Sequence, residues 1–398
     1  MRAWQIVVAY ESKLVKRNWL FRLFIVGVLG YILVSLVPWD IRREIWRNIA
    51  FASSLPTRGV YFLNLFQSLV VVLLTCDMQR KRNKAESREI LSVKPLSNSQ
   101  FFWAELAGMA LPFLIADGVF MAFCLFIHLM IPDSPVNPWV YLSFLLKDVL
   151  PTFVSVTGLS LLANRILRHP FVSWLVLTVF LCTSYAYLTK PFHGILDFRG
   201  SLLPESFSSI VGFMHSDVCL LQRGMFLLLG LGLLCVAVPF TRRLSEMPGR
   251  KVFYHAAGCL LLMSAVGTGY VYIDKFQTRR ENREAYREVF SRYEAYPKMR
   301  IATHDITYKP KGETFSATSR MTVVNRKAER MEQLILFLNP GLEISKLKSG
   351  EEKVPFRRDR QAVVVERSLA PGDSVVLEID YGGCIDEDIY QVDIDEED

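Results

Sequence analysis

Long apolar runs alternate with short polar segments over residues 1–273, and from residue 274 onward the chain is polar with a period of two. A helix crosses a bilayer with about 20 mostly apolar residues. By that measure the pattern predicts seven spans, over 20–39, 58–77, 103–131, 139–163, 170–188, 224–240 and 253–273. We therefore expect an α-helical polytopic membrane protein of about seven spans, followed by a domain of different architecture.

The N-terminal residues 1–19 precede the first apolar run and are amphipathic. On a helix their basic side chains lie away from one apolar face, which is formed by Ile6, Val7, Tyr10 and Leu14. This pattern is typical of a helix that lies in the membrane interface. We do not expect a cleavable signal peptide, because the first apolar run ends in VPWD and not in a small-residue cleavage site.

Residues 298–385 carry alternating and β-branched stretches such as TFSATSRMTVVN and DSVVLEIDY. Turn signals separate these stretches, at Lys311-Gly312, Asn339-Pro340-Gly341, Ser349-Gly350 and Pro371-Gly372-Asp373. About seven short strands fit, and a sandwich is their natural packing. The pattern thus predicts an all-β, sandwich-like domain.

Two polar segments flank this domain. In 274–297, Arg280/Glu284 and Glu288/Arg292 stand four residues apart, a stabilising spacing that predicts a solvated juxtamembrane helix. Residues 386–398 are rich in acidic side chains and lack Lys and Arg. We expect a solvated tail there, with calcium binding as the alternative.

Charge fixes the expected orientation. The chain is 51% hydrophobic with a net charge of +7, and Lys and Arg beside the spans account for much of that charge. No basic stripe is interleaved with aromatic residues, so nucleic acid is not an expected partner. With the N-terminus in the cytoplasm, the inside segments hold sixteen Lys and Arg residues and the outside loops hold six. An odd number of spans then places the C-terminal domain outside the membrane. The basic residues that follow the seventh span argue for the reverse, but long domains translocate largely regardless of charge.

Signatures of chemistry are scarce. The chain has no GxxxxGK[ST] segment for nucleotide phosphates, no HExxH zinc motif and no CxxC pair. We therefore expect no catalytic residue, no metal site and no cofactor in this chain. Five of the seven cysteines fall in or beside apolar runs as small hydrophobic residues. For Cys219 and Cys384, free thiols and a mutual disulfide are both open, the first being favoured.

Three ionisable residues fall at membrane depth: Asp117, Lys147 and Asp148. Charges are costly there and indicate function by default. One hypothesis pairs Asp117 with Lys147 across the third and fourth spans. The other places Lys147 and Asp148 in a water-filled or interfacial part of a shorter fourth span.

The loop between the second and third spans reads KAESREILSVKPLSNSQFFWAEL. It resembles the coupling-helix loop in permease subunits of ABC transporters of the type-2 exporter class, which has a short acidic helix containing Arg, then a Pro-Leu-Ser turn and an aromatic entry to the next span. The matching positions are Glu86, Arg88, Glu89, Ile90, Leu91, Pro95, Leu96, Ser97 and Phe101.

This resemblance implies a six-span permease domain over 20–240, preceded by a connecting helix at 1–19 and followed by an extra span within 241–273. The cytoplasmic coupling loop, 78–102, would contact an ABC ATPase subunit through Glu86, Arg88, Glu89, Ile90, Leu91 and Pro95. ATP and Mg would be used by that partner. The permease would pair as a homodimer or with a homologous half, in contact with membrane lipid. The outside loop 189–223 would hold short re-entrant helices; an ordinary surface loop with one buried helix is the alternative.

The C-terminal half shows a second resemblance. MTVVN, LILFLNPGLEISKLKSGEEKVPFRRD and LAPGDSVVLEIDYGG are similar, in that order, to the N-terminal β-domain of zinc aminopeptidases of the aminopeptidase N class. In those enzymes a catalytic domain with HExxH follows. None of the six His residues here begins that motif, so the resemblance transfers no zinc ligand.

Together these features predict a multi-pass permease subunit of an ABC transporter in the bacterial inner membrane, with an extracytoplasmic β-domain. The alternative is a membrane anchor that presents an aminopeptidase-like interaction domain and transports nothing. The sequence leaves open the substrate and the direction of transport.

Overall fold

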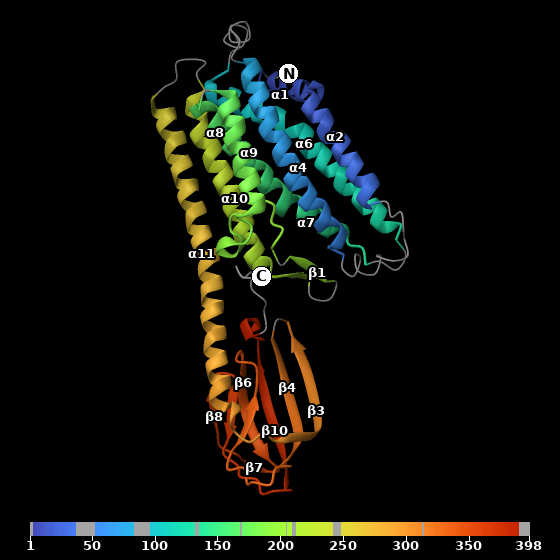
Figure 1. The fold of residues 1–398 in the computed structure, drawn as a ribbon, viewed down its shortest axis with the longest axis vertical. Helices are drawn as coiled ribbons and strands as arrows, with labels where there is room; N and C mark the ends of the chain where they lie inside the picture. The colour runs from blue at the N-terminus through green and yellow to red at the C-terminus, as the bar shows by residue number, and fades with distance from the viewer. Residues whose placement is uncertain are drawn as a thin grey trace. The chain divides into compact units, whose positions relative to one another are not determined.

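The structure is a computed structural model that describes residues 3–36, 52–82, 96–131, 135–167, 169–203, 205–208, 212–241, 248–312 and 314–389. The chain divides between Ile273 and Asp274 into two compact units. We call them the helical unit and the β unit. Figure 1 shows both, coloured along the chain.

Apolar helices form the helical unit. They are α1 (Ala3–Arg17), α2 (Trp19–Tyr31) with a π-helical end (Ile32–Leu36), α4 (Ser54–Arg82), α6 (Asn98–Leu129), α7 (Pro138–Phe144), α8 (Leu150–Leu167), α9 (Pro170–Ala186), α10 (Ser216–Ala237) and the first part of α11 (Pro248–Glu294). The largest core cluster contains residues of α1, α2, α4, α6, α7, α8, α9 and α10, with Phe24, Leu63, Phe113 and Phe120 completely buried. The outward faces of α6, α9 and α11 expose large apolar side chains, as expected for helices that face lipid.

Five of the described helices are long and apolar enough to cross a membrane: α4, α6, the continuous α7–α8 segment, α10 and α11. A sixth results if the bent pair α1–α2 counts as one span. The apolar run 170–188 forms a helix of 17 residues, at the lower limit for spanning. The count of seven spans therefore stays a prediction. The 47-residue helix α11 joins the predicted seventh span to the juxtamembrane segment without a break.

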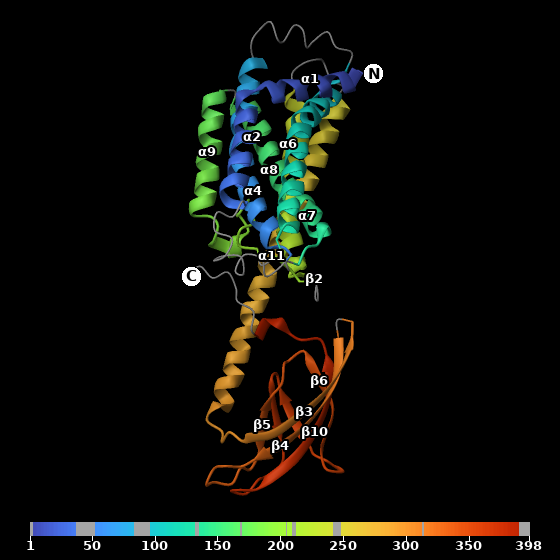
Figure 2. The same cartoon turned by 90° about the vertical axis from the view of Figure 1, so that its right-hand side faces the viewer.

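Helix α1 lies across one end of the bundle (Figure 2). It meets α2 at a bend of 65°, where the Asn18 side chain caps α2 by accepting a hydrogen bond from the Leu20 N–H. Gly108 allows α6 to pack closely against α1, because a Cβ added at this position would lie 2.6 Å from the Cβ of Glu11. Val7 packs inward, whereas Ile6, Tyr10 and Leu14 are exposed. One apolar face of α1 is therefore left uncovered by the helical unit.

The predicted outside loop, 189–223, folds differently from both expectations. Pro191–Gly194 is a 3-10 turn, and β1 (Ser206–Ser208) pairs with β2 (Gly212–Met214) in a small antiparallel hairpin. Residues from 216 onward already belong to α10. No re-entrant helix forms in the described part of the loop, where three consecutive positive φ angles at Phe192, His193 and Gly194 turn the chain sharply.

The described residues of the β unit form eight strands in two antiparallel sheets. One has the order β3-β4-β10-β6-β7 and the other β5-β9-β8. The strands are β3 (Arg300–Lys311), β4 (Thr314–Val324), β5 (Leu334–Phe337), β6 (Leu342–Ser349), β7 (Glu352–Lys353), β8 (Phe356–Asp359), β9 (Ala362–Val365) and β10 (Ser374–Gly383).

Both sheets of the β unit contribute to one core. Leu347 and Leu377 come from the larger sheet, and Leu334 and Val363 from the smaller. The predicted turn glycines Gly312, Gly350 and Gly372 all have positive φ angles, which suits glycine. The C-terminal part of α11 covers the smaller sheet and buries Val289 and Tyr293 against Ala362 and Val364.

Two polar predictions have clear outcomes. The ion pairs Arg280–Glu284 and Arg292–Glu288 are present on α11, at 3.2 Å and 3.3 Å. All seven cysteines are described and free. The acidic end also begins with ordered contacts: Tyr286 donates to the Asp386 carboxylate at 2.6 Å, and Glu387–Ile389 forms a 3-10 turn.

Candidate functional site

The six predicted ATPase-contact residues, Glu86, Arg88, Glu89, Ile90, Leu91 and Pro95, lie outside the described residues. The structure begins again at Leu96, which is buried against Val7 of α1 and Phe101 of α6. Ser97 then starts α6 with a capping box, in which its hydroxyl accepts from the Gln100 N–H. The end of the predicted coupling loop is thus anchored jointly to α1 and α6.

The predicted Asp117–Lys147 pair does not form. Asp117 is completely buried, and one carboxylate oxygen accepts a hydrogen bond of 2.7 Å from the side-chain amide of Gln67 on α4. Lys147 instead pairs with Glu205, which immediately precedes the β1–β2 hairpin. Glu205 was assigned to a loop by the sequence pattern, and a loop can fold back over the end of a bundle in ways that helical spacing does not reveal.

Lys147 and Asp148 lie in a π-helical turn, Leu145–Val149, between α7 and α8. Pro151 explains the turn, since proline has no N–H to donate to the carbonyl of residue 147. The helical hydrogen-bond pattern shifts by one residue here, and the Leu150 N–H donates to the Leu145 carbonyl, five residues earlier in the chain. Such bulges are frequent at functional sites. Here the bulge directs Asp148 into the bundle, where it is 4% exposed, and leaves Lys147 partly accessible.

Arg223 of α10 is the centre of this region. Its side chain is 2% exposed, and its Nε lies 3.9 Å from a carboxylate oxygen of Asp148. The two terminal nitrogens donate to the Thr152 hydroxyl at 3.0 Å, to the Phe198 carbonyl at 3.1 Å and to the Asp197 carbonyl at 3.0 Å. The guanidinium therefore joins α8, α10 and the 197–198 segment in a single buried network.

Glycine at position 200 allows Arg223 to approach the loop backbone. Its φ is +71°, and an added Cβ would lie 2.7 Å from a terminal nitrogen of Arg223. The sequence pattern placed Arg223 in the outside loop, just before the sixth apolar run. One signal could have found it: two leucines precede it, so a helix extended backwards carries the Arg to membrane depth.

Five helices hold the loop that carries this network, one of them α8, whose Thr152 hydroxyl donates to the Phe198 carbonyl at 2.8 Å. The backbone carbonyls of the loop accept side-chain hydrogen bonds from Asn64 of α4, Ser184 of α9, Gln222 of α10 and Tyr272 of α11, at 2.6–3.0 Å. Lys147 is also covered, because its ammonium lies 3.8 Å from the centre of the Phe213 ring in the hairpin. The loop thus closes the end of the bundle opposite α1 (Figure 2).

We call these residues the charged cap: Lys147, Asp148, Thr152, Asp197, Glu205 and Arg223.

Further along the bundle, α4 and α8 meet through polar side chains, including Cys76, whose thiol lies 3.3 Å from the side-chain oxygen of Asn164. Several buried polar atoms have no hydrogen-bond partner among the described residues: Asn64 Oδ1, Asp117 Oδ1, Asp148 Oδ2, Thr157 Oγ1, Ser160 Oγ and Asn164 Nδ2. Unpaired groups of this kind are costly in an interior without water, so these atoms are candidates for binding a polar group.

No cluster of three or more His, Cys, Asp or Glu side chains in the described chain could hold a metal ion. The arrangement instead offers paired charges and unpaired hydrogen-bonding groups inside an apolar bundle. In membrane-spanning segments, ionisable residues of this kind commonly mark binding sites or pathways for polar substrates and ions.

Comparison with known proteins gives little beyond this geometry. No family model matches the chain, and no curated protein sequence matches it. Among solved structures, the chain is similar to a mutant M1 zinc metallopeptidase from Deinococcus radiodurans in complex with a Tyr-Ser-Ala substrate. The identity is 24%, the match covers 22% of this chain and 21% of that one, and the TM-score is 0.20.

Proposed function

We propose that the chain is the membrane-spanning permease subunit of an ATP-driven ABC transporter in the bacterial inner membrane. The observation that carries the proposal is the charged cap. A completely buried arginine that faces an acid at a π-helical turn is costly in a bundle of apolar helices, where a hydrophobic pair is often as stable, and ionisable residues at such depth are functional candidates by default.

The cap has the properties of a gate. Its loop is held to α4, α9, α10 and α11 by hydrogen bonds to backbone carbonyls, and Phe198 of the loop packs into the apolar core. Water or a polar substrate can replace the hydrogen bonds one for one when the loop moves. Movement of α8 against α10 would break the Asp148–Arg223 contact and connect the outer end of the bundle to the unpaired polar groups between α4 and α8.

The energy source is a separate ATPase subunit. Leu96 lies within the predicted coupling loop, 78–102, and packs against Val7 of α1 and Phe101 of α6. A push on Glu86–Leu91 would therefore be transmitted directly into α6 and, through the glycine contact at position 108, into α1. ATP binding and hydrolysis in the partner would switch the spans between two states, with the N-terminus in the cytoplasm and the β unit outside.

A second function, a membrane anchor without transport, is favoured by one feature. The β unit has its own core and a ligand-sized cavity, so it can act as a binding domain regardless of the spans. The two functions differ in their need for an ATPase and for a charged cap.

Affinity purification of the chain from its native membrane tests the proposal. We expect an ABC ATPase to co-purify with the wild type and to be lost when Glu86 and Leu91 are both changed to Ala. Arg80→Ala is the control, because Arg80 is an exposed basic residue at the start of the same loop. If the chain purifies as a stable protein without any ATPase, the result would contradict the transporter function and favour the membrane-anchor function.

A further inference from the structure

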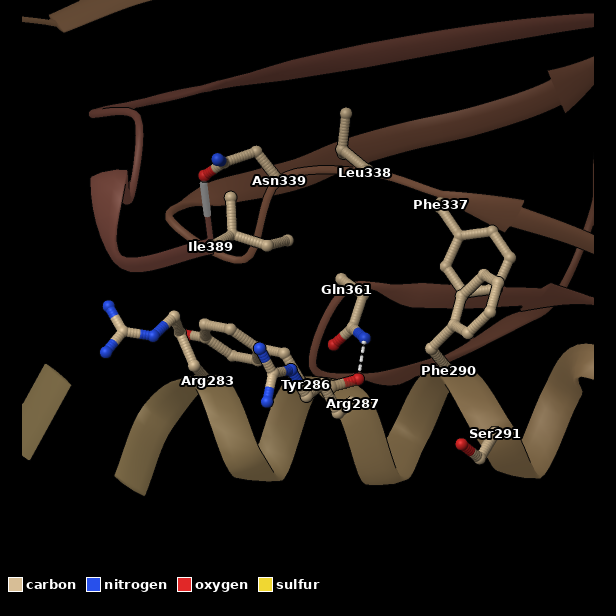
Figure 3. Close-up of a pocket in the computed structure, with 10 residues that line it drawn as sticks. All are labelled: Arg283, Tyr286, Arg287, Phe290, Ser291, Phe337, Leu338, Asn339, Gln361 and Ile389. Atoms are coloured by element: carbon tan, nitrogen blue, oxygen red, sulfur yellow. Dashed lines mark hydrogen bonds between the residues drawn. The ribbon is translucent and has the colours of Figure 1, made fainter. Parts of the chain in front are cut away.

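The β unit contains a cavity of about 760 Å³ between the C-terminal part of α11 and the smaller sheet (Figure 3). The two arginines that line it, Arg283 and Arg287, are partly or fully exposed. Charges in contact with water attract a ligand only weakly. A stronger indication of a ligand lies in the helical unit, where an acid outside the charged cap is completely buried.

This acid is Asp117, near the middle of the 32-residue helix α6. One of its carboxylate oxygens accepts the hydrogen bond from Gln67 of α4, and the other, Oδ1, has no donor among the described residues. No Lys or Arg in the described part of the chain forms an ion pair with it. Because Gln67 supplies only a neutral dipole, the carboxylate lacks a counter-charge. In a membrane span, such a group indicates a site for a ligand or an ion.

Aromatic side chains flank Asp117 on its own helix. Phe113 lies one turn before it and Phe120 one turn after it, on the same face of α6, and both rings are buried. Five further rings, from α2, α4 and α8, have their centres 5.1–6.4 Å from one of these two: Phe21, Phe24, Tyr31, Phe62 and Phe153. Ring faces attract cations, so the aromatic surroundings and the carboxylate favour the same sign of charge.

The neighbouring unpaired atom on α4 is also a hydrogen-bond acceptor. Asn64 stands one turn before Gln67, on the same face of the helix. Its Nδ2 donates to the Arg199 carbonyl at 3.0 Å, and its Oδ1 has no donor among the described residues. A ligand that enters between α4 and α6 thus meets oxygen atoms that accept and do not donate. An ammonium group offers both donors and positive charge, whereas a carboxylate or phosphate is repelled by Asp117.

We propose that the contact between Gln67 and Asp117 is the binding site for a monovalent organic cation, in which an ammonium group is attached to an aromatic or other apolar group. The ammonium group donates to Asp117 Oδ1, and the apolar group packs against Phe113 and Phe120. Separation of α4 from α6 breaks the Gln67–Asp117 hydrogen bond and opens the site. That this cation is the transported substrate rests on the proposed permease function, but the site itself does not.

Isothermal titration of the full chain in nanodiscs tests the site with three ligands that share an indole ring and differ in charge: tryptamine, tryptophol and indole-3-acetate. Empty nanodiscs correct for partition into lipid. We expect tryptamine to bind, and tryptophol to bind at least about tenfold more weakly, because a charge-assisted hydrogen bond is lost. Indole-3-acetate should not bind measurably.

Two variants assign the effect to one carboxylate. Asp117→Asn keeps an oxygen for the hydrogen bond from Gln67 and removes the charge, so it should lower the affinity for tryptamine to that for tryptophol. Asp217→Asn removes the same charge from an exposed position of α10, and should change the affinity less than twofold. Size-exclusion chromatography verifies that both variants fold.

Three results would overturn the site. The first is equal affinity for tryptamine and tryptophol. The second is wild-type binding of tryptamine by Asp117→Asn. The third is displacement of tryptamine by sodium chloride but not by choline chloride at the same concentration, which would identify a metal cation as the ligand.

The titration needs neither ATP nor a partner subunit, so it separates the site from the transport function. A chain that binds tryptamine but co-purifies with no ATPase would contradict the transporter and retain the cation site. A chain that keeps its ATPase but does not bind tryptamine would overturn the cation site alone.

Discussion

Replacing Arg223 by Met tests whether the charged cap is the organising element of the helical unit. The substitution removes the cation that faces Asp148 and leaves a carboxylate that is only 4% exposed without a partner in α10. It also removes the donors to the Thr152 hydroxyl and to the carbonyls of Asp197 and Phe198. Breaking a buried ion pair from one side costs about 3–5 kcal/mol. We expect the free energy of unfolding to fall by that amount.

A second substitution separates the loss of a partner from the loss of packing. In Arg223→Met with Asp148→Asn no charge remains unpaired, and replacing a buried pair by neutral groups is often close to neutral. The double variant should therefore be more stable than Arg223→Met alone by at least about 1 kcal/mol. The control Arg320→Met removes an exposed arginine from β4 and should stay within about 0.5 kcal/mol of the wild type.

Reversible unfolding in mixed detergent micelles, followed by circular dichroism, measures these differences. Two results would refute the reasoning. Arg223→Met could unfold within about 1 kcal/mol of the wild type, which would mean that the guanidinium stabilises nothing. Alternatively, the double variant could be as unstable as the single one, which would assign the loss to packing and not to Asp148.

Two further predictions concern packing. Helices α8 and α10 cross at Gly158 and Gly230, and a Cβ added at position 230 would lie 2.5 Å from the Ser155 backbone nitrogen. Gly230→Ala should therefore destabilise the helical unit by about 1–3 kcal/mol. The control Gly224→Ala lies on the same helix with open space around it, and should be neutral or slightly stabilising. In the β unit, Tyr293→Ala opens the contact between α11 and the smaller sheet and should cost about 3 kcal/mol, visible as faster hydrogen exchange in β9. Tyr308→Ala, a 57% exposed control, should leave that exchange unchanged, and equal effects of the two would contradict the packing.

Much of the secondary structure could be predicted from the sequence because it depends on local composition. The apolar runs 58–77 and 139–163 lie within longer helical segments, and the run 103–131 is helical as far as Leu129, in a helix that begins earlier, at Asn98. The predicted turn glycines mark real turns for the same reason. The strands of the β unit were undercounted by about one, since β7 has only two residues and no alternation to detect.

The buried polar residues of the helical unit could be predicted only in part. Asp117, Lys147 and Asp148 were identified by their depth, which is a local property. Their partners Gln67, Glu205 and Arg223 come from elements far along the chain, so the pairing depends on how the helices and the loop pack. The π-helical turn was also missed, because the effect of Pro151 on the preceding turn is small compared with the apolar signal around it.

The central claim is that ATP in a partner subunit opens the charged cap, and the native thiol of Cys219 reports on it directly. Cys219 lies one turn before Arg223 on α10 and is 1% exposed. With the co-purified complex in nanodiscs, a polar thiol reagent and peptide mass spectrometry measure its labelling with and without ATP. Exposed Cys384 of the β unit is the internal reference. The account predicts that ATP increases the labelling of Cys219 severalfold while that of Cys384 stays constant. Cys219 that remains protected during ATP turnover by the bound ATPase would contradict it.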